Sequence, residues 1–106
     1  MKKTANGEVY CFGEGLVAHF PINDKDFLLV IREFCVKFTA ESATLRYDNI
    51  NDLSGTCSVS GSISHDEYSV TLSISTGTAT QAVDGKLDSS TTHEEFWGLD
   101  GKWISG

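Results

Sequence analysis

Long hydrophobic segments are missing from this chain of 106 residues. Its longest apolar run covers residues 27–31, whereas a helix that crosses a bilayer needs about 20 apolar residues. No apolar stretch follows Met1, Lys2 and Lys3, so the sequence does not predict a secretory signal. We therefore expect a cytoplasmic protein without a membrane-spanning segment.

Cysteine is scarce and odd in number. Cys11, Cys35 and Cys57 are widely spaced, whereas small secreted domains held by disulfides carry a larger, even set. Each cysteine has apolar neighbours, which predicts small buried thiols in the reduced state. One disulfide between two of the three is the alternative.

Recognisable catalytic and cofactor motifs are also missing. None of the ten glycines falls in a G-x-G-x-x-G or G-x-x-x-x-G-K pattern, and no serine lies in a G-x-S-x-G turn. Acidic pairs follow His65 and His93, as in half of a metal site, but zinc sites usually bring two Cys or two His a few residues apart. We therefore predict a protein that is not an enzyme and has no metal or cofactor.

Basic residues are few. Lysine and arginine number 8 against 15 aspartate and glutamate, which gives a net charge of −7. Residues 1–40 are balanced, with five of each sign, so the whole excess lies in residues 41–106, with three basic and ten acidic residues. Nucleic acid and anionic membranes are therefore excluded as expected partners, whereas a basic protein would be attracted. The plain alternative is that the acidity serves solubility.

The clearest pattern in the sequence is an alternation of apolar with serine and threonine residues. It covers residues 56–64 and 68–76, on either side of a polar break at residues 65–67. This pattern predicts a β-hairpin with one buried face. Residues 8–12 and 16–20 flank Gly13-Glu14-Gly15 and predict a first hairpin, whose second strand ends at Pro21.

Two Asp-Gly pairs predict further hairpins, because they suit a type I′ turn. Asp100-Gly101 lies between residues 95–99 and 102–104, and Asp84-Gly85 lies between residues 78–83 and 86–90.

Residues 23–38 have two interpretations. Phe27, Val30, Ile31 and Phe34 recur at helical spacing after a capping Asn23 or Asp24, which favours a helix near residues 24–35. The same segment also alternates and is rich in β-branched residues, which favours a strand. We predict a single mainly β or α+β domain over residues 1–106. Its fold is a twisted antiparallel meander of about six to eight strands, forming a half-barrel or sandwich with that helix, and an all-β fold is the alternative.

Acidic and aromatic residues gather near the C-terminus. Aromatic side chains anchor protein interfaces, and carboxylates form charge-assisted hydrogen bonds with Arg and Lys. The residues that we predict to bind a partner are Asp66, Glu67, Tyr68, Glu94, Glu95, Trp97, Asp100 and Trp103. The alternative is that both tryptophans belong to the core and the acids form a solvated rim.

In size, acidity and lack of catalytic motifs, the chain resembles the small immunity proteins of bacterial toxin systems, including those of contact-dependent growth inhibition. The resemblance implies a basic toxin as partner, commonly an RNase or DNase, whose cationic cleft a monomeric inhibitor blocks in a 1:1 complex. Two other classes stay open. They are a small-ligand carrier with a cavity in its curled sheet, and a structural subunit.

Overall fold

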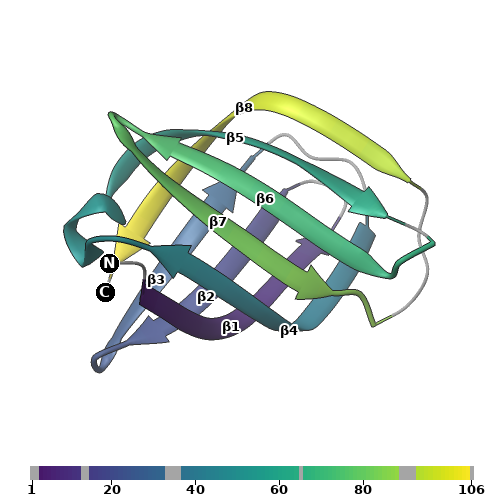
Figure 1. Ribbon diagram of the computed structural model, residues 1–106, viewed down its shortest axis with the longest axis horizontal. Coiled ribbons are helices and arrows are strands. Elements are labelled where there is room, and N and C mark those ends of the chain that lie inside the picture. Colours follow the sequence, from purple (N-terminus) through teal and green to yellow (C-terminus); the bar gives the residue numbers. More distant parts are fainter. Residues whose placement is uncertain (1–2, 13–14, 33–36, 65, 89–92, 106) are drawn as a thin grey trace.

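The computed structural model describes residues 3–12, 15–32, 37–64, 66–88 and 93–105. These residues form eight strands and one short 3₁₀ helix (Figure 1). The elements are β1 (Lys3–Phe12), β2 (Leu16–Ile22), β3 (Lys25–Ile31), β4 (Lys37–Tyr47), η1 (Ile50–Asp52), β5 (Gly55–Ser64), β6 (Ser69–Thr76), β7 (Ala79–Lys86) and β8 (Glu94–Ser105).

The strands close into one antiparallel barrel in the order β1-β2-β3-β8-β5-β6-β7-β4, with β4 again beside β1. Each half of the chain supplies a three-strand meander and one further strand. In the first half, β1–β4, the strand β4 pairs with β1 and with β7 of the second half. In the second half, β5–β8, the strand β8 pairs with β5 and with β3 of the first half. The two halves therefore have the same topology, and β4 and β8 lie opposite each other in the barrel.

Apolar side chains fill the barrel interior. They come from all eight strands, since every strand directs alternate residues inward. Leu53, which follows η1, is also fully buried. Gln81 is the one buried polar side chain among the described residues, and its Oε1 accepts a hydrogen bond from Thr76 Oγ1 at 2.9 Å. The barrel is therefore a packed core, and the cavities described below lie at its edges.

Two of the predicted hairpins are confirmed. The alternating segments around residues 65–67 form β5 and β6, which pair from Ser58↔Ser75 to Ser64↔Ser69. The N-terminal pair forms β1 and β2. The second of these strands continues past Pro21, which is exposed and lies opposite Asp26, to Ile22.

The predicted helix near residues 24–35 is wrong, and the all-β alternative describes the fold better. Residues 25–31 form β3, and residues 33–35 lie outside the described part. Asn23 and Asp24, expected to cap a helix, have φ values of 50° and 66° and form a two-residue hairpin turn. Asn and Asp tolerate positive φ, and a type I′ turn requires it at both positions.

Both predicted Asp-Gly turns are also wrong. Asp84-Gly85 lies inside β7 and Asp100-Gly101 inside β8, and both strands run straight through. A Cβ atom on Gly101 would lie 3.1 Å from Val59 Cγ2 and 3.2 Å from Cys57 Sγ. Glycine is therefore present there because side chains of the neighbouring strand β5 leave little room for a Cβ atom. The sheet closes fully into a barrel, which corrects the predicted half-barrel or sandwich.

Candidate functional site

Five carboxylates gather at one end of the barrel, which we call the acidic end. Glu94 and Glu95 begin β8 and lie opposite Ile63 and Ser62 of β5, next to the turn that carries Asp66 and Glu67. The chain after β7 reaches the same place, since the Leu87 N–H donates to the Tyr68 carbonyl at 2.8 Å. The residues of the acidic end are Asp66, Glu67, Asp88, Glu94 and Glu95, and all five are exposed.

Two large aromatic side chains lie exposed on the elements that form this end. Trp97 of β8 is 73% exposed and Tyr68 is 48% exposed. Gly98 explains the position of Trp97, because it adds one residue to β8 opposite Ser60 and has a φ of 62°. This bulge lets Phe96 and Leu99 both turn toward the interior, so that Trp97 points outward. Strict alternation from Leu99 would have placed Trp97 inside.

Trp103 does not belong to this surface, although the sequence analysis included it among the partner-binding residues. Its side chain is 2% exposed and lies in the barrel core, opposite Leu29 and Gly55. Asp100 is exposed, but it lies farther along β8, opposite Ser58. Seven of the eight predicted residues are therefore at the surface, and six of those lie on the first four residues of β8 or on the β5–β6 turn.

The two described cysteines are buried thiols. Cys11 and Cys57 form no disulfide, and Cys35 lies outside the described residues. Burial raises the pKa of the Cys57 thiol to about 11, which keeps it protonated and unreactive near neutral pH. This agrees with the prediction of reduced core thiols for these two residues.

Histidine takes part in one network that the sequence analysis missed. His19 on the outer face of β2 lies between two carboxylates, with Nε2 at 2.8 Å from Asp26 Oδ1 and Nδ1 at 3.4 Å from Glu8 Oε1. The hydrogen bond with Asp26 and the weaker one with Glu8 raise the pKa of His19, against the opposing effect of burial. Tyr10 completes the network, since its hydrogen bond to Glu8 raises the tyrosine pKa to about 12.

No metal site emerges from the described residues, in which no group of three or more His, Cys, Asp and Glu side chains could hold an ion. His93 Nε2 lies 4.0 Å from Glu95 Oε1, and His65 lies outside the described part.

The His19 network could have been found from the register of β1, β2 and β3. That register places Glu8 and His19 side by side in one row, and Asp26 lies two residues from Leu28, which ends the row on β3.

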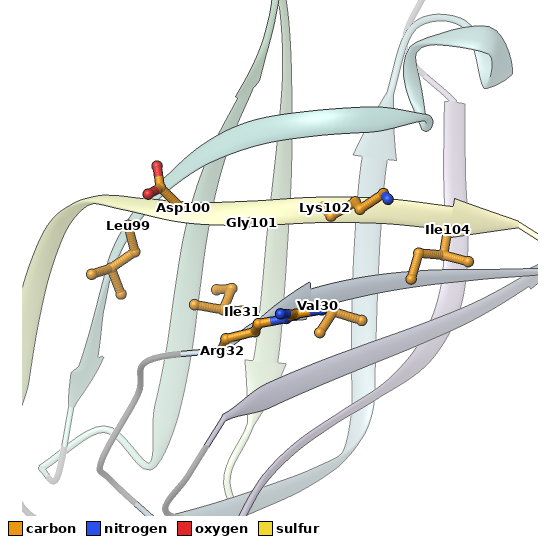
Figure 2. Close-up of a pocket in the computed structure, with 8 residues that line it drawn as sticks. All are labelled: Val30, Ile31, Arg32, Leu99, Asp100, Gly101, Lys102 and Ile104. Atoms are coloured by element: carbon orange, nitrogen blue, oxygen red, sulfur yellow. The ribbon is translucent and has the colours of Figure 1, made fainter.

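An open cleft of about 340 Å³ lies where β3 and β8 part (Figure 2). The two strands pair from Phe27↔Ser105 to Ile31↔Gly101, and within the described residues no strand pairs with the β3-facing edge of residues 97–100. Figure 2 shows Ile31 and Leu99 extending toward each other across the opening, with Val30 and Ile104 farther along. The polar lining residues are Arg32, Asp100 and Lys102.

The corresponding place at the second seam between the halves, where β4 meets β7, is covered. There β7 pairs with β4 as far as Lys86↔Ser42, and the chain beyond it bonds to β4 again. The Asp88 N–H donates to the Thr39 carbonyl at 3.0 Å, and Thr39 Oγ1 donates to Asp88 Oδ2 at 3.0 Å. The opening therefore lies at one of the two seams between the halves, and the described residues do not repeat it at the other, so it does not follow from the topology.

Comparison with known proteins gives no match to a family model, to a curated protein or to a solved structure. The described residues also contain no helix long and apolar enough to span a membrane.

Proposed function

We propose that this protein is an acidic inhibitor that binds a basic protein through the acidic end and the adjoining part of β8. The observation that carries the proposal is the 73% exposure of Trp97 beside Glu94 and Glu95. The bulge at Gly98 holds this tryptophan in solvent beside two carboxylates, and tryptophan is among the residues most enriched in binding hot spots. The partner-binding residues are Asp66, Glu67, Tyr68, Glu94, Glu95, Trp97 and, at the edge, Asp100.

The basic protein that best fits this surface is a toxin domain with a cationic cleft, such as an RNase or DNase. Its cleft carries Lys and Arg to hold phosphates, and those same groups would meet the carboxylates of the acidic end. Inhibition would then be steric and electrostatic, in a 1:1 complex formed in the cytoplasm. Attraction between the two charge patterns speeds association, whereas Trp97 and Tyr68 slow dissociation. This is the way of working that the resemblance to bacterial immunity proteins implies.

Capture of the partner and a comparison of two matched variants test the proposal. The tagged protein is incubated with an extract of its own cells at low and high salt, and a stoichiometric basic protein is purified for kinetic measurement. Glu94→Gln with Glu95→Gln should slow association about tenfold at low salt, and Trp97→Ala should raise the Kd at least about thirtyfold.

The control is Asp52→Asn with Asp24→Asn, which removes the same two charges away from the acidic end. Asp52 lies in η1 before β5, whereas the acidic end follows β5, and Asn tolerates the positive φ of position 24 in the β2–β3 turn. Equal slowing by both pairs would mean that net charge, and not the acidic end, attracts the partner. No basic protein captured at either salt concentration, or a captured protein whose activity is not inhibited, contradicts the proposal.

A further inference from the structure

The cleft between β3 and β8 differs in charge from the rest of this acidic protein. Two of the chain's 8 lysine and arginine residues, Arg32 and Lys102, line it. The ion pairs among the described residues are made by Arg46 with Asp84, by His19 with Glu8 and Asp26, and by His93 with Glu95. Neither Arg32 nor Lys102 takes part in them, so both cations are available to a bound anion.

The one carboxylate of the cleft does not cancel these cations. Figure 2 shows the Asp100 carboxylate on the side of β8 that faces away from β3. The Arg32 side chain, in contrast, runs along β3 over Val30, and Lys102 lies along β8 in the direction of Ile104. A charged group placed over the opening would therefore lie nearer to a guanidinium than to a carboxylate.

Between the two cations the cleft is apolar. Ile31 and Leu99 form its inner part, Val30 is half-buried, and Ile104 is 44% exposed. Its volume of about 340 Å³ is at the lower end of the range of small-molecule sites, which is roughly 300 to 1,000 Å³. An apolar body with a single charged head is the shape and chemistry that these walls accept.

We infer that this cleft binds a small amphipathic anion, with its apolar chain or ring between β3 and β8 and its carboxylate at Arg32 and Lys102. The guanidinium can form two parallel hydrogen bonds with a carboxylate, and the flexible lysine can add a third contact. The cleft lies outside the acidic end and shares only Asp100 with the proposed partner surface, and the inference does not rest on the proposed inhibitor function. It differs also from a carrier with an interior cavity, since the ligand lies at a seam on the barrel wall.

Three ligands with the same chain and different heads test the inference: octanoate, octanol and octyltrimethylammonium. Each is titrated into the ¹⁵N-labelled protein below its micelle concentration, and amide shifts give the Kd and the location. We expect octanoate to bind most tightly and octyltrimethylammonium most weakly, with the largest shifts at Arg32, Leu99, Gly101 and Lys102. A protein with a net charge of −7 attracts the cation overall, so a preference for the anion has to arise locally.

Matched variants then locate the preference. Arg32→Gln and Lys102→Gln should each weaken octanoate binding by about tenfold or more, with the larger effect for Arg32, and leave octanol unchanged, as expected for loss of charge-assisted hydrogen bonds. Lys25→Gln, at the other end of β3, removes the same charge and should change neither ligand. Ile104→Ser should weaken all three ligands. Tighter binding of the cation, shifts outside the cleft, or equal effects of the Lys25 and Arg32 variants would overturn the inference.

Discussion

The outer surfaces of the two halves differ far more than their topology. On the second half, β5 and β6 direct an uncharged set of serines and threonines outward, including Ser58, Thr71, Ser73 and Ser75, and the neighbouring β7 adds Asp84 and Lys86. On the first half, β1, β2 and β3 direct outward the Glu8–His19–Asp26 network and the half-buried Val17, Leu28 and Val30. The inner face alone is enough to specify the barrel, so the outer face is free to differ.

The difference also shows which wall of the barrel can bind other molecules. A serine-rich wall offers little apolar area and few charges to a partner. The apolar residues of β3 and β8, the open cleft and the exposed Trp97 all lie on the remaining wall or at its edge. The following three predictions test whether the halves are equivalent in their cores and different at their edges, and they run from the largest expected effect to the smallest.

The first prediction concerns the glycine in the leading strand of each half. A Cβ atom on Gly7 of β1 would overlap the His19 carbonyl oxygen, and one on Gly61 of β5 would overlap the Thr71 carbonyl oxygen. Because backbone has to move in both cases, Gly7→Ala and Gly61→Ala should each lower the free energy of unfolding by about 3 kcal/mol, measured by urea denaturation.

The control for these variants is Gly77→Ala, at a turn with nothing within 4 Å of the added atom but a φ of 62°. It should lower the free energy of unfolding by only about 1 kcal/mol, because alanine is strained in the left-handed conformation. If alanine at Gly7 were tolerated while alanine at Gly61 unfolded the protein, the close approach of the neighbouring backbone would not be equivalent in the two halves.

The second prediction compares the edges of β4 and β8 by amide hydrogen exchange. Successive N–H groups of an antiparallel strand point to opposite edges, so one of Leu99 and Asp100 points away from β5 and should exchange fast. The amide of residue 88, bonded to the Thr39 carbonyl, should be protected. Asp88→Ala removes the second bond to Thr39 and should speed exchange at residue 88 about fivefold, whereas Asp66→Ala should not. Equal protection of residues 88, 99 and 100 would mean that both edges are covered.

The third prediction is that the free energy of unfolding depends on pH through a group in the first half, His19. The folded state raises the pKa of His19 above its usual value of about 6.5, chiefly through Asp26. Protonated His19, bonded to its carboxylates, therefore stabilises the folded state fully below pH 6.5, and this stabilisation is lost as the pH rises through the raised pKa. Denaturation of the wild type between pH 6 and 8 should show this decline, and His19→Asn should remove it. A decline that persists in His19→Asn would assign the effect to another group.

Much of the fold followed from alternation, because a strand with one buried face carries a period of two. That pattern predicted the β5–β6 and β1–β2 hairpins correctly. It could not decide residues 25–31, since Leu28 and Val30 on the outer face are as apolar as the inner residues, and a strand apolar on both faces looks like a helix. Closure of the barrel was equally hidden, because it depends on β8 lying between β3 and β5.

The turn residues were misleading for a related reason. Asn23-Asp24 forms a turn and Asp100-Gly101 does not, although the second pair is the stronger turn signal. Glycine is used in β8 because side chains of the neighbouring strand β5 lie where a Cβ atom would be, and sequence alone cannot separate this use from a turn. The bulge at Gly98 had the same effect on the site, since it moved Trp97 outward and left Trp103 in the core.

The pairing of β4 and β8 with strands of both halves has a consequence for how the chain folds. The free edge of β3 can pair only with residues 101–105, and the free edge of β4 can pair only with β7. Neither half can therefore complete its own sheet. Pairings this distant in sequence raise the contact order and slow folding to the range of milliseconds to seconds. On the ribosome, the first half would expose its apolar inner face until the last strand had emerged. Barrel closure is therefore a single late event that joins both halves at once.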